Sequence, residues 1–423
     1  MFKVFANAWK IPDLRKKILY TLMLIVVFRL GSSIPVPFLN GAALKDMLSN
    51  GDTLFNMYNI ISGGAFENAT IFAMSITPYI NSSIIMQLLS VAIPALERKA
   101  KEGEEGRKFI AQWTRYLTVI LALLQATGLY FGLRGVVTER SVFSYLVVVF
   151  TFTAGTAFLM WLGEQINEKG IGNGISIIIF AGIVSGGPSM INTIFQMNTN
   201  GQLNIITTIL LVVFVIAVIG IVVLMNNAER RIPVQYAKRV VGRKMYGGQS
   251  THIPIKVAMA GVMPIIFAIS IISFPATICQ LLGVTAQSGG FWGGFLRVMS
   301  QGSWVYSIIY FVLIIFFTYF YTEMQYNPIE MANNMKQNGG FVPGIRPGKT
   351  TADFISSILN KITFVGAIFL ALIAVMPMFL TSVLGAGLAF GGTSLLIVVG
   401  VALETVKQLE SQMLMRHYKG FLE

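Results

Sequence analysis

Long apolar runs alternate with short polar stretches along the whole chain. Each run is close to twenty residues long, about the length of α-helix that crosses a bilayer core of roughly 30 Å. The pattern therefore predicts an all-α integral membrane protein with ten transmembrane helices. The predicted spans are residues 18–36, 69–93, 114–133, 142–162, 173–192, 203–225, 257–283, 304–322, 361–383 and 393–412.

The composition supports this interpretation. Of the 423 residues, 55% are hydrophobic and only 12% are charged, and the mean hydropathy is +0.70. Soluble domains carry about 25% charged residues. The composition excludes an ordinary soluble enzyme.

The distribution of positive charge predicts the orientation. The chain has 31 Lys and Arg residues against 18 Asp and Glu, a net charge of +13. Most basic residues lie in the first 17 residues, after every even-numbered span and in the tail; the alternate side has only Lys45, Arg134, Arg140 and Arg297. Because cytoplasmic loops are enriched in Lys and Arg, both termini are expected in the cytoplasm.

Candidates for chemistry are few. Cys279 is the only cysteine and cannot form an intramolecular disulfide, and His252 and His417 are too few for a metal site. No phosphate-binding G-x-x-x-x-G-K-[ST] loop is present. We expect no catalytic residue, metal or cofactor. The basic start and the long first apolar run, without a small-residue cleavage pattern, predict a retained first span.

Ten spans suggest two five-span halves. We expect a cytoplasmic segment 1–17, a first half 18–192, a second half 193–412 with large cytoplasmic loops 226–256 and 323–360, and a tail 413–423. An odd number of spans per half makes the second half start on the opposite side, as in inverted repeats. A pathway would then lie between the halves.

Residues Leu54 to Ala65 interrupt this picture. The segment is too short to span the membrane and too apolar for a free loop, which favours a re-entrant or internally packed segment. An interfacial helix on the outer surface is the alternative. Gly63 and Gly64 would provide a hinge at its end.

The span interiors carry few ionisable groups, which argues against an ion-coupled carrier. Arg29 lies near the outer end of the first span, and Glu404 and Lys407 are placed to neutralise each other on one helical face. The spans do contain uncharged polar residues. These indicate either ordinary helix packing or a weakly bonded contact between helices that can open. The residues are Asn81, Ser82, Ser83, Gln125, Ser270 and Ser273.

The two cytoplasmic loops offer docking surfaces. Loop 226–256 carries seven Lys and Arg residues with interleaved tyrosines; it is a topology signal, a lipid-headgroup contact or a site for an anionic partner such as RNA. In the second loop, Gly and Pro residues around Phe341 to Arg346 predict a turn that presents Arg346 outward for specific recognition.

Seven motifs, in order, resemble the SecY/Sec61 alpha family of protein-conducting channels from end to end. One departure is Phe38, where the family usually has Gly. The motifs are FRLGSSIPVP (28–37), ITPYI (76–80), GIGNGISIIIFAGIV (170–184), RRIPVQYAKR (230–239), QSTHIPIK (249–256), FVPGIRPG (341–348) and FGGTSLLIVV (390–399).

The resemblance implies an hourglass pore between two inverted five-helix halves, closed by a ring of apolar side chains. A narrow ring of this kind would dewet and resist ions. By motif, the ring residues are Ile76, Ile80, Ile175, Ile179, Ile266 and Ile397.

The resemblance also implies a plug, a lateral gate and a docking site. The plug is segment 54–66, with Leu54, Phe55, Met57, Tyr58, Ile60, Ile61 and Phe66. The gate lies between spans 2 and 3 on one side and spans 7 and 8 on the other, with candidates Asn81, Gln125, Ser270 and Phe274. The candidate docking residues are Arg230, Arg231, Lys238, Arg239, Arg243, Lys244 and Arg346.

The expected function is that of a passive, gated conduit for unfolded polypeptide in the bacterial plasma membrane. Energy would come from the SecA motor or a ribosome, and SecE and SecG would be the neighbouring subunits. Signal peptides, nascent chains and membrane lipids would be the other partners. A small-solute transporter built on inverted repeats is the alternative from another class, and a lipid-embedded scaffold is the third.

Overall fold

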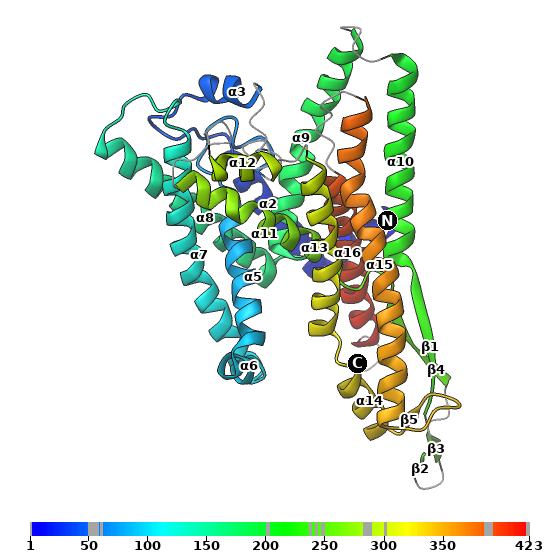
Figure 1. Ribbon diagram of the computed structural model, residues 1–423. Helices are drawn as coiled ribbons and strands as arrows, with labels where there is room; N and C mark the ends of the chain where they lie inside the picture. Colours follow the sequence, from blue (N-terminus) through cyan, green and yellow to red (C-terminus); the bar gives the residue numbers. More distant parts are fainter. Residues whose placement is uncertain are drawn as a thin grey trace.

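The computed structural model describes residues 2–49, 59, 62–199, 204–236, 239–241, 244–246, 250–281, 290–299, 303–384 and 392–419, and helices dominate it (Figure 1). The helices are α1 (Phe2–Lys10), α2 (Pro12–Gly31), α3 (Gly41–Ser49), α5 (Thr77–Ala92), α6 (Pro94–Ala100), α7 (Glu104–Gly132), α8 (Val142–Lys169), α9 (Gly174–Thr199), α10 (Ile205–Asn227), α11 (Met263–Leu281), α12 (Phe291–Val298), α13 (Trp304–Gln325), α14 (Pro328–Gln337), α15 (Lys349–Leu384) and α16 (Gly392–Lys419). The strands are β1 (Glu229–Tyr236), β2 (Arg239–Val241), β3 (Lys244–Tyr246), β4 (Ser250–Lys256) and β5 (Gly340–Phe341).

Every predicted span overlaps a helix of the structure, in the order α2, α5, α7, α8, α9, α10, α11, α13, α15 and α16. In the described part of the chain, four stretches are long and apolar enough to cross a membrane: Val142–Lys169, Ile205–Asn227, Trp304–Gln337 and Lys349–Met376. The pair α5 and α6, bent by 106°, is a fifth. The chain is therefore a multi-pass membrane protein, and the count of ten crossings stays a prediction.

The second predicted span starts later than expected. Helix α5 begins at Thr77, and residues 63–69 and 71–76 form turns where the sequence predicted helix from residue 69 onward. Ala69 and Ser75 adopt positive φ angles of 48° and 53°, which a right-handed helix does not accommodate. Pro78 fits the first turn of α5, where its missing N–H costs no hydrogen bond.

This turn segment is wedged between helices. Phe72 stacks between Phe28 of α2 and Phe158 of α8, with ring centroids 5.9 and 6.0 Å apart. A Cβ on Gly155 of α8 would overlap the carbonyl oxygen of Ile71, so the backbones touch there. The apolar run beginning at residue 69 is therefore buried as turns rather than as helix.

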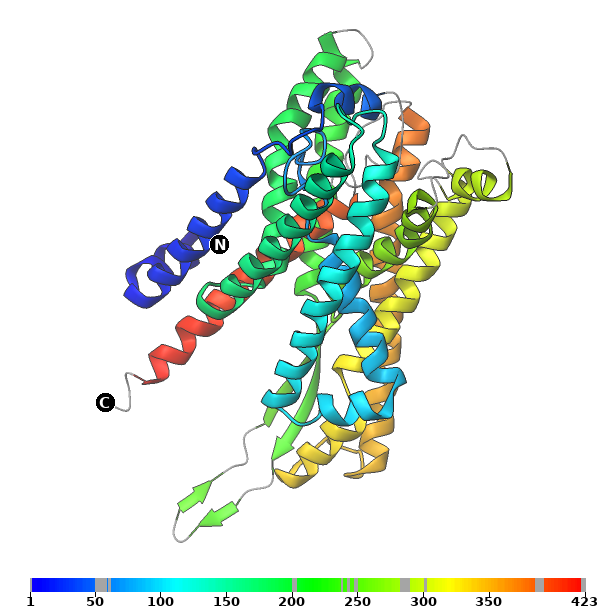
Figure 2. The same ribbon diagram turned by 90° about the vertical axis from the view of Figure 1, so that its left-hand side faces the viewer.

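Two apolar clusters fill the helical body. The larger one draws buried side chains from α2, α5, α8, α9, α10, α11, α13, α15 and α16, and so joins both predicted halves. The smaller one packs α3 and the turn segment against α7 and α8. Figure 2 shows many of the long helices running roughly along one direction, while the blue α2 and the red α16 slant across it.

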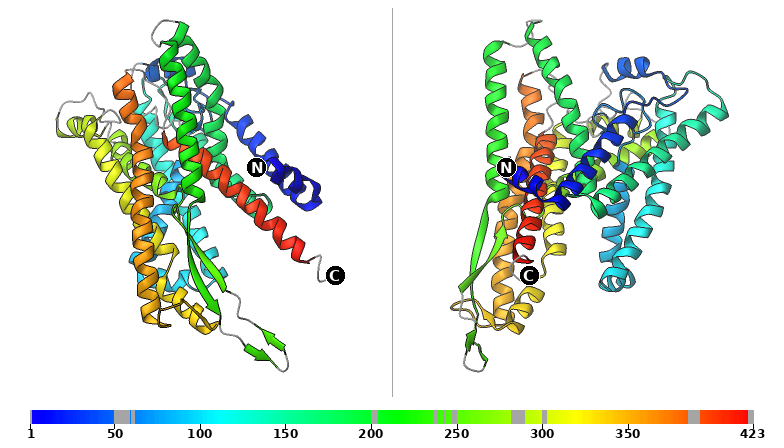
Figure 3. Two further views of the ribbon diagram at one scale, coloured as in Figure 1. Left: turned by 90° about the vertical axis from the view of Figure 1, so that its right-hand side faces the viewer. Right: turned by 180° about the vertical axis from the view of Figure 1, so that it is seen from behind.

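The loops that the sequence treats as two docking surfaces form one small sheet. Strand β1 pairs antiparallel with β4, from Glu229 opposite Lys256 to Gln235 opposite Ser250, and with β5, so the order is β4-β1-β5. Ile232 and Val234 of β1 are buried against Ile355 and Leu359 of α15. Strands β2 and β3 form a separate two-stranded sheet that lies farther from the helices (Figure 3).

The elements gather at two ends. Helices α6 and α14 and the sheet lie at one end, and α3 and α12 lie toward the other (Figure 1). Near the chain ends, α1 and the start of α2 pack against α16 through Ala8, Leu14 and Leu409. Lys17 also donates a hydrogen bond to Gln412 at 3.4 Å. The amino-terminal segment and the last helix are therefore neighbours.

Candidate functional site

The glycine-rich stretch 170–174 positions the start of α9. Gly172 has a φ of +86°, and the side-chain oxygen of Asn173 accepts hydrogen bonds from the backbone N–H groups of Ile175 and Ser176 at 3.2 and 3.3 Å. Such a cap satisfies donors that the first helical turn leaves open. It places Ile175 and Ile179 one turn apart at the beginning of α9.

The second predicted pair, Ile76 and Ile80, lies at the start of α5. Ile76 immediately precedes α5, and its carbonyl oxygen accepts a hydrogen bond from the N–H of Ile80 at 3.1 Å. Ile76 is fully buried and Ile80 nearly so. Helix α5 therefore begins in the interior of the protein, with both side chains buried.

The structure brings all six predicted ring residues into one apolar cluster. Four of them, Ile76, Ile80, Ile179 and Ile397, are buried members of it, and Ile175 and Ile266 pack against it partly buried. They come from α5, α9, α11 and α16, which are distant in sequence. The cluster contains many other side chains, so the ring itself stays a prediction.

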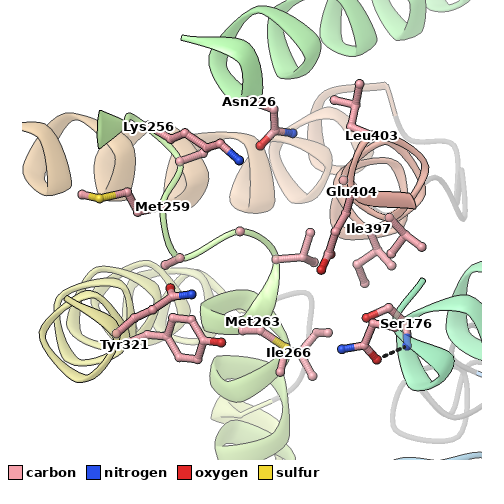
Figure 4. A pocket seen from close by; sticks show the side chains of 18 of the residues that line it. Ser176, Asn226, Lys256, Met259, Met263, Ile266, Tyr321, Ile397, Leu403 and Glu404 are labelled. Carbon is pink, nitrogen blue, oxygen red and sulfur yellow. Dashed lines mark hydrogen bonds between the residues drawn. The ribbon is translucent and has the colours of Figure 1, made fainter. Parts of the chain in front are cut away.

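A cavity of about 310 Å³ opens against three of these isoleucines (Figure 4). Ile179, Ile266 and Ile397 line it together with polar and charged groups, among them Lys256 and Glu404. Figure 4 shows Ile266, Ile397 and Ser176 on one side of the space and Lys256 and Asn226 on the other. The cavity therefore has charged and polar groups facing a wall that contains isoleucines and Ser176.

Lys407 lines the same cavity and caps a helix rather than neutralising its neighbour. Its amino group donates to the carbonyl oxygen of Asn226 at 3.2 Å, in the last turn of α10. A cation at that position satisfies an unpaired carbonyl and the helix dipole. No ion pair joins Lys407 to Glu404 within the described residues, so the predicted pair is wrong.

The predicted gate helices touch one another. Helix α11 packs against α5, α7 and α13, and Asn81, Gln125 and Ser270 are buried in this region. The Gln125 side-chain oxygen is buried without a hydrogen-bond partner. Phe274, by contrast, is 42% exposed. Three of the four candidates are therefore buried where these helices meet, and the gate itself stays a prediction.

Most of the predicted plug lies outside the described residues, namely Leu54, Phe55, Met57, Tyr58, Ile60 and Ile61. Phe66 is described and fully buried. It packs in the smaller cluster with Leu44 and Leu129 rather than with the ring isoleucines. Gly63 and Gly64 have φ angles of +63° and +84°, as expected for a sharp turn at this point.

Only some of the predicted docking residues lie among the described residues. Arg230 and Arg231 are exposed on β1, and the guanidinium of Arg231 donates to Glu229 at 2.8 Å. Lys238 and Arg243 lie outside the described residues, and only the backbone of Arg239 and Lys244, in β2 and β3, is described. The structure therefore places the β1 end of this basic surface.

Arg346 lies in the predicted turn. It is exposed between β5 and α15, and its carbonyl oxygen accepts a hydrogen bond from the Thr351 hydroxyl at 2.8 Å. Gly344 and Gly348 have φ angles of +81° and +108° on either side of it. The turn is thus fixed to the first turn of α15 and presents Arg346 to solvent.

Comparison with known proteins decides the family. The SecY family model matches residues 70–406. The chain belongs to the SecY family. It is 47% identical to protein translocase subunit SecY of Halalkalibacterium halodurans over 435 residues and to that of Bacillus subtilis over 436, with all of each chain covered.

Solved structures agree on the fold. One, of a SecY whose plug domain stabilises the closed state of the translocation channel, matches with a TM-score of 0.68 at 19% identity, covering 94% of this chain and 92% of that one. Another, of Sec61 in the canine ribosome-channel complex, matches with a TM-score of 0.65 at 17% identity, with the same coverage. The chain is a SecY-family translocase subunit with the fold of the SecY/Sec61 channels.

Sequence reasoning missed the sheet and the polar wall of the cavity. The sheet could have been predicted from the sequence pattern, because the buried residues Ile232 and Val234 of β1 alternate with exposed ones. Lys256 and Asn226 had none, because they reach the cavity only through the end of β4 and of α10. Their positions depend on tertiary packing.

Proposed function

We propose that this SecY-family subunit is a passive, gated conduit for unfolded polypeptide. The observation that carries the proposal is the meeting of the cavity with Ile179, Ile266 and Ile397, which belong to three helices from both predicted halves. A wettable space that ends on branched apolar side chains suits a closed constriction. Such a pore needs no catalytic residue of its own.

The six isoleucines form the constriction in this proposal, between an inverted first half 18–192 and second half 193–412. The seam of α5 and α7 against α11 and α13 is the lateral exit. An apolar segment leaves through it into lipid, because hydrocarbon does not accept the unpaired polar groups of an extended chain. Segment 54–66 is the plug in this proposal; in the matched SecY structure a plug domain stabilises the closed state of the translocation channel and maintains a membrane seal.

The partners follow from the exposed basic surface. Arg230, Arg231 and Arg346 lie on one sheet and its adjoining turn, which suits an anionic or carboxylate-bearing partner. We assign this surface to the ribosome and the SecA motor, with SecE and SecG as neighbouring subunits. The matched Sec61 structure is itself a ribosome-channel complex.

We place the chain in the bacterial plasma membrane with both termini in the cytoplasm. The concentration of Lys and Arg on one side supports this orientation. The packing of α1 and the start of α2 against α16 supports a common side for the two ends.

Photo-crosslinking tests the pathway. A crosslinker replacing Ile80 or Ile179 in the assembled translocase should capture a secretory chain stalled during export. The matched control is Ile209 of α10, which is 59% exposed on the outer surface of the helices and should capture lipid only. Equal capture of the stalled chain from Ile209, or none from Ile80 and Ile179, would refute the pore assignment.

A further inference from the structure

The turn that follows the predicted plug is held to itself by a dense set of hydrogen bonds. The amide of Asn59 donates to the Glu67 carboxylate at 2.9 Å, and its side-chain oxygen accepts from the Glu67 N–H at 3.1 Å. The Ser62 hydroxyl accepts from the N–H of Phe66 at 3.0 Å. Residues 62–67 are therefore tied to one another and to Asn59; we call residues 62–67 the root.

The backbone of the root lies directly against α9. A Cβ on Gly63 would overlap the carbonyl oxygen of Gly182, so the backbones are in direct contact. The hydroxyl of Ser185, one turn further along α9, lies 3.3 Å from the carbonyl oxygen of Gly63. This hydroxyl is the polar tie between the root and α9.

Arg29 of α2 fixes that hydroxyl from the other side. Its guanidinium donates to the Ser185 oxygen at 2.7 Å. An arginine keeps its charge under all ordinary conditions, and a hydrogen bond from a charged donor is stronger than a neutral one. Arg29, near the outer end of a span with an exposed side chain, thus has a specific partner.

The tie is releasable because the Ser185 hydroxyl has a second acceptor. Its oxygen lies 2.6 Å from the carbonyl oxygen of Gly182, on its own helix. A hydroxyl has one proton, so it donates to Gly182 or to Gly63 and keeps a partner when the root departs. Release of Gly63 therefore does not leave the Ser185 hydroxyl without an acceptor, which removes one part of the cost of undocking.

We propose that Arg29 and Ser185 form a latch that positions the root on α9 in the closed channel. The two are positioning residues that act through Gly63 and do not contact the translocating chain. The latch deepens the proposed function, on which it rests, because opening requires the segment attached to the root to move. Docking itself is measurable without transport.

Accessibility of the root tests the latch directly. Ala65 is 1% exposed, and Cys279 is the only native cysteine. In the complete translocase carrying Cys279→Ala and Ala65→Cys, we expect slow modification by a membrane-impermeant maleimide. Ser185→Ala or Arg29→Gln should speed it about fivefold, the factor that corresponds to one ordinary hydrogen bond. Ser185→Thr, which keeps the hydroxyl, should restore the slow rate.

The controls separate the latch from general destabilisation and from the proposed function. Ser90→Ala removes a hydroxyl that is 2.7 Å from its own helix backbone at Gln87, and should leave the rate unchanged. Equal rates in all variants, or a rise only alongside a lower thermal unfolding midpoint, overturns the latch. Faster labelling with unchanged ion conductance supports the latch and refutes the sealing role assigned to the segment.

Discussion

Gln235 of β1 lies opposite Phe341 of β5 in an antiparallel ladder, and Tyr236 lies opposite Gly340. This short contact joins the loop between α10 and α11 to the loop between α13 and α15. Arg230 and Arg346, more than a hundred residues apart, therefore stand on one rigid body. A partner that binds both loops meets a preformed surface and loses little conformational freedom in ordering it.

Arg346→Glu should impair motor-driven export severalfold while membrane insertion and abundance stay intact. The guanidinium is exposed on a fixed turn, and the loss of one hydrogen bond to a charged group is worth about 1.5 to 3 kcal/mol. Export of a secretory substrate into inverted membrane vesicles measures it. Lys349→Glu, an exposed charge reversal three residues away, is the matched control, and an equal defect there would indicate bulk charge.

Ribosome binding to the same surface should weaken steeply as salt rises. Neutralising RNA phosphates with Lys and Arg releases bound counterions, so the logarithm of the binding constant falls linearly with the logarithm of salt concentration. Co-sedimentation of the purified translocase with ribosomes from 50 to 300 mM salt gives the slope. A flat response would assign the basic loops to another contact.

Ile397→Ser should raise the ion leak of the resting channel severalfold and allow export of substrates with defective signal sequences. A hydroxyl beside the isoleucine cluster favours water in the constriction. Planar bilayer conductance and an export assay measure the two effects. Ile209→Ser, on the exposed face of α10, should change neither one. A tight channel in the Ile397 variant would remove this residue from the ring.

Gln125→Leu should hold the lateral seam closed more firmly. The side-chain oxygen is buried without a partner, and such a group costs about 1 to 3 kcal/mol. We expect a model segment to need more apolar residues before it enters the membrane. Gln112→Leu, on the exposed face of the same helix, serves as the control. An unchanged insertion threshold in the Gln125 variant would mean that this residue only packs.

Gly155→Ala should lower the thermal unfolding midpoint of the purified protein, because the added Cβ meets the backbone at Ile71, which has nowhere to move beside the stacked Phe72. Gly220→Ala should not lower the unfolding midpoint. No atom lies within 4 Å of a Cβ at that position in α10, and alanine favours a helix over glycine by about 1 kcal/mol. A midpoint unchanged by Gly155→Ala would show that the contact relaxes.

The helices were predictable because each follows from a long apolar run, which has few alternatives in a membrane. Phe38 was informative too. The resemblance implied Gly at this position, and the structure gives Phe38 a φ of +65°, a backbone conformation that glycine adopts more readily.

Other parts depend on contacts that sequence alone does not reveal. Residues 69–76 are as apolar as a span, yet they fold into turns because Gly31 and Gly155 leave room for Phe72 and Ile71. The β4-β1-β5 sheet requires pairing across about a hundred residues. Of the ring, sequence selected the six isoleucines by resemblance, and the structure adds only that they meet in one cluster.

Helix α15 connects the sheet to the apolar cluster that contains the ring isoleucines. Its stretch Lys349–Met376 has 28 residues, so it is about 42 Å long at about 1.5 Å per residue. The same rod carries Ile355 and Leu359 in the packing beneath the sheet, and Leu370 and Ile373 in the cluster that holds the ring isoleucines. A partner that tilts the turn at Arg346 therefore acts on a helix whose other part is packed among the isoleucines that we propose as the constriction.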